Sequence, residues 1–276
     1  MRIILISKAL VLFFGLLVFS TPVYCSEEDE QISYLAAGIG LEQLTYKEQV
    51  PDIELASSGT DLTNWTLFLE GRKTWESFFF GARSYIPLSL DESQEYWTRE
   101  GEFEQTNSLE YLWFRIDAHV GYYMHRLLNP YVGISWSYSE QERSNFENVN
   151  SPGIFDQSAL EEVSSFFALF GIQGNFPIAS KWSFTYSAEY QLPFYSNITN
   201  SGAPGWEASN IGGYAYALTG SLNYYINKDL STSLQVRGGK LHWDGSDWIT
   251  AGGTRAKWPE NDTDFISGFI SIYKYF

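Results

Sequence analysis

The sequence predicts an all-β fold, a single closed antiparallel up-and-down transmembrane β-barrel of about ten strands. Two observations predict it. About ten segments of the chain alternate large apolar or aromatic side chains with small or polar ones, which is the period of a strand with one face in lipid. The connections between these segments are alternately short and long, as expected when short turns face the periplasm and long loops face outwards.

The first residues have the pattern of a secretory signal peptide. Residues 1–8 are short and basic, residues 9–19 are apolar, and cleavage after Cys25 would leave an acidic mature N-terminus. A membrane-anchoring helix needs about 20 apolar residues, and Pro22 interrupts the run. Cys25 is the single cysteine, and a lipid anchor on it is disfavoured because the bulky Tyr24 precedes it. The expected organisation is a signal peptide over 1–25 and a barrel over 26–276.

The clearest predicted strand is 182–192, in which every even position is apolar or aromatic and every odd position is polar. In a strand this places all the large groups on one face. A soluble sandwich would alternate too, but it would hide its aromatic residues in a shared core. The strands expected in chain order are 33–47, 62–71, 75–88, 108–124, 132–138, 165–176, 182–192, 214–224, 230–236 and 264–276.

The predicted connections differ in charge as well as in length. The short ones lie near 71–74, 125–130, 177–181 and 227–229 and carry Lys and Arg, whereas the long ones at 48–61, 89–107, 140–162, 196–211 and 244–262 are rich in Asp and Glu. An even number of strands closes the sheet and satisfies every backbone group inside lipid. Both chain ends then lie on the periplasmic side.

The last predicted strand, 264–276, places Ile266, Gly268, Ile270 and Ile272 on one face and ends in Phe276. It resembles the C-terminal strand of bacterial outer-membrane β-barrels. The resemblance implies a multi-pass protein of a Gram-negative outer membrane, with loops exposed at the cell surface and Phe276 read as a signal by the barrel assembly machinery. Membrane lipid and lipopolysaccharide are the further partners it implies.

Composition narrows the range of partners and chemistry. A net charge of −16 argues against nucleic acid, and 18% aromatic residues suit the girdles that barrels place at both membrane interfaces. The three His residues are scattered along the sequence, so no metal site is expected. We expect a monomer without a cofactor.

Charged residues in the phase of the lumen form the first candidate site. A narrow barrel brings side chains from opposite walls together. The charges could form a salt-bridged plug, or they could line a constriction in a narrow, porin-like channel with His119 on a proton path. The residues are Glu70, Arg83, Arg115, Asp117, His119, Glu189 and Arg237.

A second candidate site lies at the predicted outer rim, where His242, Asp244 and Asp91 could act catalytically. The architecture is similar to that of the omptin surface proteases, but their motifs are not matched, so the resemblance assigns no catalytic residue here. No His is followed two residues later by Ser, which disfavours the acyl hydrolase barrels. Tryptophans of the outer loops could bind carbohydrate or pack the loops onto the rim: Trp97, Trp206, Trp243, Trp248 and Trp258.

These patterns favour a non-enzymatic surface protein with a charge-plugged lumen and acidic extracellular loops that bind an outside partner. The alternatives are the narrow channel and a surface hydrolase of omptin-like architecture with a rearranged rim site.

Overall fold

The computed structural model describes residues 33–50, 56–100, 102–148, 151–155, 158–203, 205–251 and 254–276. The expected signal peptide lies outside these residues. The strands are β1 (Tyr34–Val50), β2 (Ala56–Trp75), β3 (Phe78–Pro87), β4 (Glu92–Arg99), β5 (Glu102–Tyr122), β6 (Asn129–Asn148), β7 (Ser151–Phe155), β8 (Ala159–Ala179), β9 (Trp182–Asn200), β10 (Glu207–Ser209), β11 (Gly213–Asn227), β12 (Leu230–Trp243), β13 (Ile249–Ala251), β14 (Thr254–Ala256) and β15 (Glu260–Tyr275).

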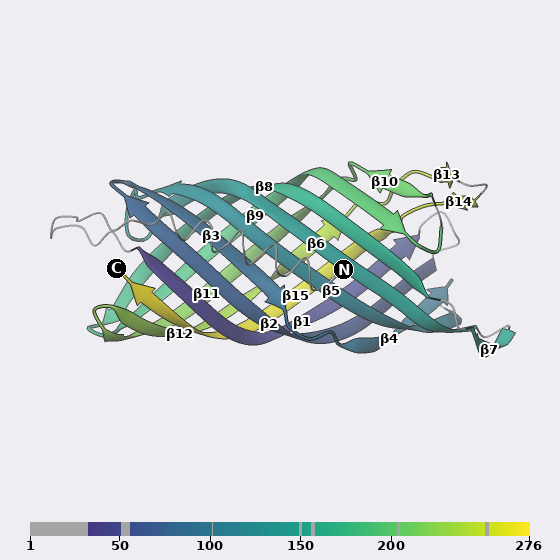
Figure 1. The fold of residues 1–276 in the computed structure, drawn as a ribbon, viewed down its shortest axis with the longest axis horizontal. Helices are drawn as coiled ribbons and strands as arrows, with labels where there is room; N and C mark the ends of the chain where they lie inside the picture. Colours follow the sequence, from purple (N-terminus) through teal and green to yellow (C-terminus); the bar gives the residue numbers. More distant parts are fainter. Residues whose placement is uncertain are drawn as a thin grey trace.

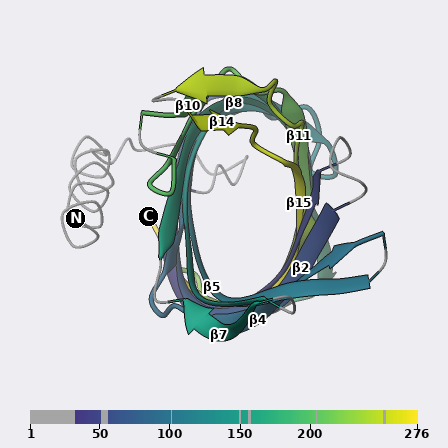
Figure 2. The same ribbon diagram turned by 90° about the vertical axis from the view of Figure 1, so that its right-hand side faces the viewer.

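In the described residues, ten antiparallel strands form a closed barrel (Figures 1 and 2). The order around the wall is β1, β2, β3, β5, β6, β8, β9, β11, β12 and β15, and β15 pairs with β1 to close the ring. β4 continues the wall beyond β3 by pairing with both β2 and β5. The predicted all-β barrel of about ten strands is therefore confirmed.

The barrel has two unlike ends. Short connections at 76–77, 123–128, 180–181 and 228–229 lie at one end, called here the turn end, together with Tyr275 at the end of β15. The remaining connections and the short strands β7, β10, β13 and β14 lie at the other end, the loop end, on the right in Figure 1. None of the described residues forms a helix of the length and hydropathy needed to cross a membrane.

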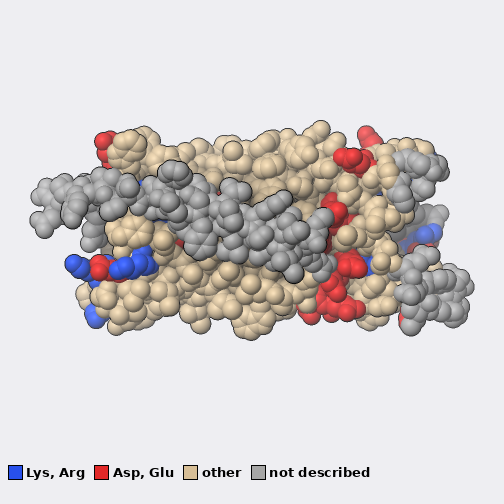
Figure 3. Space-filling view, viewed as in Figure 1, with Lys and Arg blue, Asp and Glu red and all other residues tan. Residues whose placement is uncertain are grey.

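Around the turn-end half, the wall carries an outward apolar band. On β15, Ile266 and Ile270 are 55% and 65% exposed, while Ser267 and Ser271 face inwards and are buried. Figure 3 shows this uncharged surface between basic side chains at the turn end and a belt of acidic side chains towards the loop end. The band ends at Leu41 on β1, because the next outward residues on that strand are polar.

Beyond the band, the alternation of the wall strands inverts. On β1, Gly38 and Gly40 face the lumen beside outward Ile39, whereas further along Leu44 and Tyr46 are buried inside. The outer face no longer meets lipid there, so polar groups turn outwards and apolar groups fill the interior, as in a water-soluble barrel.

The strands are longer at the loop end than the sequence predicts. The predicted loop 89–107 contains all of β4, and the predicted loop 140–162 contributes residues 140–148 to β6. The wall therefore continues well past the apolar band, and the true connections at the loop end are shorter than expected.

Candidate functional site

Four charged side chains from four different strands meet in the middle of the lumen. The carboxylate of Glu189 lies 2.5 Å from Arg83 Nη1 and 3.8 Å from Arg237 Nη2. Arg83 also lies 3.3 Å from Asp117, and the Tyr131 hydroxyl donates a hydrogen bond of 2.6 Å to Glu189. All four charged groups are buried. The ion pairs cross the barrel from wall to wall because β3 and β9 lie on opposite sides of the ring.

Arg115 has a partner that sequence reasoning missed. Its Nη2 donates a hydrogen bond to Glu42 on β1, which also accepts one of 2.9 Å from Ser267 Oγ. The guanidinium carbon lies 3.8 Å from the centroid of the Trp113 ring, a cation–π contact. Glu42 could have been found from its phase, since it follows inward-facing Gly40 by two residues.

Glu70 takes no part in the ion pairs. Its oxygens accept hydrogen bonds from the hydroxyls of Tyr34 at 2.8 Å and Tyr273 at 3.4 Å. Glu70 faces the lumen, where its hydrogen-bond partners are phenol hydroxyls and not guanidinium groups.

His119 fills a slot between two glycines in register with it on the neighbouring strands, Gly81 and Gly133. A Cβ on Gly81 would lie 2.3 Å from His119 Nε2, so a larger residue there would displace the ring. The ring packs against Tyr131, with 4.9 Å between centroids, and within the described residues its Nδ1 has no hydrogen-bond partner. His119 is therefore packed against rings, and among the described residues no hydrogen bond links it to a carboxylate.

The loop-end half of the lumen is filled by an apolar core. Trp258, from the connection before β15, is 1% exposed, and Trp206, from the connection after β9, is 5% exposed. Of the loop tryptophans, these two and Trp243 point into the core, whereas Trp248 is 37% exposed and stacks with Arg255. The core consists of Leu44, Tyr46, Leu62, Leu109, Tyr111, Trp113, Val163, Phe167, Ile198, Ala203, Trp206, Ala208, Ala215, Ala217, Leu241, Trp243, Trp258 and Phe265.

A second group of charges lies at the loop end of this core, beyond the apolar band. Arg143 Nη2 donates to Glu48 at 2.6 Å, and its Nε donates to Glu95 at 2.8 Å. Glu161 accepts a hydrogen bond of 2.7 Å from Trp258 Nε1, which holds the tryptophan inside the barrel. The three carboxylates are buried around one guanidinium.

Although these carboxylates surround one guanidinium, their pKa values shift in different directions. Burial raises the pKa of Glu48 to about 7, despite the opposing effect of Arg143, and the charge of Glu95 adds to the increase. Burial also opposes ionisation of Glu95, but Arg143 and hydrogen bonds from Ser58 and Asn107 outweigh it and lower its pKa.

Because the folded-state pKa of Glu48 lies above its unfolded value of about 4.3, the folded chain keeps a proton that the unfolded chain loses between these values. We therefore expect the free energy of unfolding to fall as the pH rises from about 5 to 7, by up to about 3 kcal/mol, and to level off above that. Urea titrations across this range check it. Glu95 adds no pH dependence of stability in this range, because its lowered pKa means that it titrates at more acidic pH.

The substitution Glu48→Gln should flatten this pH dependence, and Glu102→Gln, at an exposed position, should leave it unchanged. A smaller slope should remain, because burial also raises the pKa of Glu161. An unaltered slope in Glu48→Gln would contradict the assignment.

At the rim, the structure brings His242 and Asp244 together but leaves Asp91 apart. His242 Nε2 lies 3.3 Å from Asp244, and its Nδ1 lies 2.8 Å from Asp262, which also pairs with Lys240 at 2.8 Å. Burial opposes ionisation of Asp262, but hydrogen bonds from Lys240 and His242 lower its pKa. Asp91 instead accepts a backbone hydrogen bond of 2.9 Å on β2, and β1 and β15 separate β2 from β12.

The His242 ring lies on the outer surface of the wall, since its neighbours Leu241 and Trp243 point into the core. Sequence reasoning missed the hydrogen-bonded pair of His242 and Asp262. It has the form of a base held by a carboxylate, but no described second carboxylate pair faces it to place a water. No group of three or more His, Cys, Asp or Glu suited to a metal ion occurs among the described residues.

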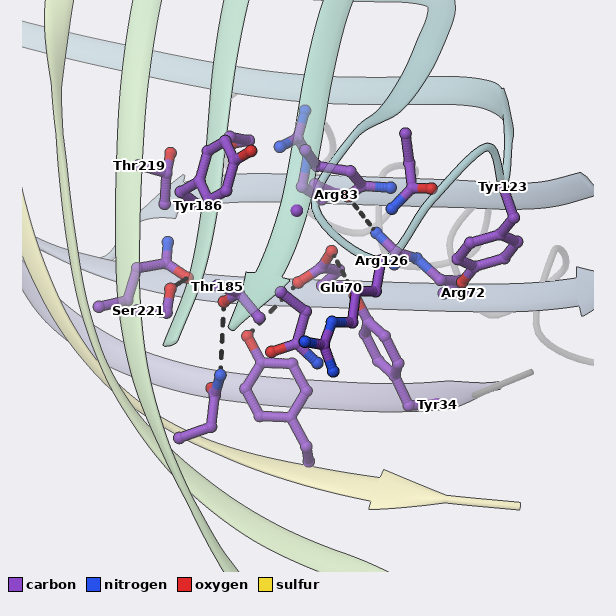
Figure 4. Close-up of a pocket in the computed structure, with 18 of the residues that line it drawn as sticks. Tyr34, Glu70, Arg72, Arg83, Tyr123, Arg126, Thr185, Tyr186, Thr219 and Ser221 are labelled. Atoms are coloured by element: carbon purple, nitrogen blue, oxygen red, sulfur yellow. Dashed lines mark hydrogen bonds between the residues drawn. The ribbon is translucent and has the colours of Figure 1, made fainter. Parts of the chain in front are cut away.

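A cavity of about 620 Å³ opens at the turn end (Figure 4). Its mouth lies between the turn at 76–77 and the connection 123–128, and its lining reaches Tyr85 and Arg83, which belongs to the central ion pairs. Nearby, the backbone N–H of Phe276 donates to the carbonyl of Ser33 at 3.1 Å, so the two described ends of the chain meet at this mouth.

The fold is similar to that of solved outer-membrane barrels. The outer membrane protease OmpT from Escherichia coli matches with a TM-score of 0.65 at 10% identity, over 93% of this chain and 100% of that one. The translocator domain of autotransporter NalP from Neisseria meningitidis (TM-score 0.40, 8% identity, 98% and 95% covered) and OprG from Pseudomonas aeruginosa (0.36, 9%, 89% and 97%) also match. No family model and no curated protein matches the sequence.

These likenesses show the fold alone. The chain has the architecture of bacterial outer-membrane β-barrels, and this architecture is omptin-like. A membrane lipid environment follows from this fold.

Proposed function

We propose that this protein is a non-enzymatic outer-membrane surface protein with a sealed lumen, whose loop end faces the outside of the cell and binds a positively charged partner there. The observation that carries the proposal is the filled lumen. The apolar core occupies the loop-end half and the central ion pairs lie beneath it. A packed core of this kind supports a plug over a channel.

The acidic loop end supports the choice of partner. The exposed carboxylates there greatly outnumber the exposed cations, so the surface would attract basic groups over several ångströms. Those closest to the apolar band would share divalent cations with lipopolysaccharide phosphates. The exposed acidic residues at this end, among those that the structure describes, are Asp61, Glu92, Glu100, Glu102, Glu147, Glu207, Asp244 and Asp247.

The assembly signal at Phe276 and a monomeric state belong to the same proposal. Phe276 is 52% exposed at the turn end, where an assembly factor on the periplasmic side would reach it. The surface hydrolase alternative rests on the couple of His242 with Asp262. It would require cleavage of basic peptides that is lost in His242→Ala.

A conductance measurement tests the sealed lumen. Purified protein in planar bilayers should show conductance near the baseline, and Arg115→Ala should leave it there, because the apolar core lies between Arg115 and the loop end. A sizeable conductance that changes in Arg115→Ala would overturn the plug and favour the channel. A porin of known conductance reconstituted in parallel serves as the positive control.

A further inference from the structure

The turn-end cavity differs from the rest of the lumen in how its arginines are neutralised. Deeper in the barrel, Arg83 and Arg115 each contact a carboxylate. Within the described residues, neither Arg72 nor Arg126, which line the cavity, makes a salt bridge. The mouth of the cavity therefore carries two positive charges without a carboxylate in contact, in a chain whose net charge is −16.

Arg72 is held in a fixed position. Its guanidinium carbon lies 5.3 Å from the centroid of the Tyr34 ring and 4.7 Å from that of Phe79, and its Nη2 donates to Gln173 at 2.5 Å. Its Nε is buried and has no hydrogen-bond partner in the part of the chain that the structure describes. The nearby Glu70 is already bonded to tyrosine hydroxyls. A guanidinium partly removed from water in this way is costly unless an anion accompanies it.

The walls of the cavity also offer unmatched hydrogen-bonding groups of both kinds. Asn129 is 4% exposed, and neither its Oδ1 nor that of Asn175 accepts a hydrogen bond from any described residue. Likewise, the Nε2 of Gln173 finds no acceptor among the described residues. A peptide backbone supplies N–H donors and carbonyl acceptors together, so the combination of arginines and amides fits an acidic peptide better than a simple inorganic anion.

Such a segment lies next to the cavity in the sequence. Ser33 is buried at the mouth, where its Oγ accepts a hydrogen bond from the backbone N–H of Thr74, and Tyr34 lines the cavity. The acidic run Glu27-Glu28-Asp29-Glu30 precedes Ser33 by three to six residues. Those residues span roughly 10–20 Å when extended, and a tether this short gives an effective concentration on the order of millimolar.

We propose that the turn-end cavity is a binding site for a carboxylate-rich peptide segment, anchored by Arg72 and Arg126, and that the chain's own run at 27–30 occupies it. The inference is independent of the extracellular function, because a conducting barrel could hold the same segment.

Fluorescence anisotropy with a labelled peptide copy of residues 26–32 tests the site. The host is purified protein in which Glu27→Gln, Glu28→Gln, Asp29→Asn and Glu30→Gln are combined, so that its own run no longer competes. We expect saturable binding that weakens with salt. In this host, Arg126→Gln should weaken binding about tenfold or more, as loss of a charge-assisted hydrogen bond does.

Lys228→Gln is the matched control, since Lys228 is an exposed cation of another turn at the same end and does not line the cavity. Arg72→Gln should act like Arg126→Gln, and heat-modifiable migration on gels shows whether each variant is folded. Absence of binding, or equal weakening by Lys228→Gln, would overturn the site.

Peptide binding by the unsubstituted protein tests whether the chain's own run at 27–30 occupies the cavity. It should bind the added peptide about tenfold or more weakly than the neutralised host, because its own run already fills the cavity. Equal binding by the two proteins would overturn occupancy by residues 27–30 and identify a separate acidic peptide as the occupant.

Discussion

Replacing Glu189 with alanine is expected to lower the free energy of unfolding by about 3–5 kcal/mol, because it breaks a buried group of ion pairs. Glu189 is the shared partner of Arg83 and Arg237, and it also accepts a hydrogen bond from the hydroxyl of Tyr131. Its removal leaves two buried guanidinium groups facing each other, with Asp117 still in contact with Arg83. Urea titration of the protein refolded in lipid vesicles measures the loss.

Two further variants make this result specific. Glu102→Gln, at an exposed position, should change the free energy of unfolding by less than about 0.5 kcal/mol. Combining Glu189→Leu with Arg83→Met should recover part of the loss, because the double variant leaves one fewer unpaired charge. A loss below about 1 kcal/mol in Glu189→Ala would mean that water hydrates these arginines and that their stability does not depend on Glu189.

Replacing Trp258 with alanine is expected to cost about 3–5 kcal/mol and to release the connection 244–259 from the barrel. The side chain is 1% exposed, packs against Trp243 and donates its indole N–H to Glu161. Without it, Arg255 and Lys257 should become accessible to trypsin while the wall stays intact. Limited proteolysis followed by mass spectrometry locates the cleavage.

Trp248→Ala is the matched control in the same connection, since Trp248 is 37% exposed and contacts Arg255 rather than the core. It should leave both the stability and the trypsin pattern close to those of the unsubstituted protein. If both variants behave alike, the connection is held by something other than the insertion of Trp258.

The sequence was most informative where one face of a strand meets lipid. In 182–192 and 264–276 the apolar residues recur at every second position, and both segments lie in wall strands, β9 and β15. A strand in lipid has one possible arrangement of its faces, so period and phase can be read from the residues. The inward placement of Arg115, Asp117 and His119 follows from the same phase.

Prediction was weaker beyond the apolar band. The sequence predicts loops for residues 92–99 and 140–148, which are rich in polar side chains, but they form β4 and the end of β6. With water on the outer face, the alternation inverts and polar groups mark the outside of a strand rather than a loop. The inward Trp206 and Trp258 were missed as core residues for the same reason.

The sequence by itself determined the class of fold and which residues of the band face inwards, because these depend on a period of two along each strand. Only the tertiary structure decided which inward groups touch. Glu42 meets Arg115 and Glu189 meets Arg83 across the lumen, and His242 meets Asp262 on the neighbouring strand. Such contacts depend on the closure and register of the whole barrel, which no single segment encodes.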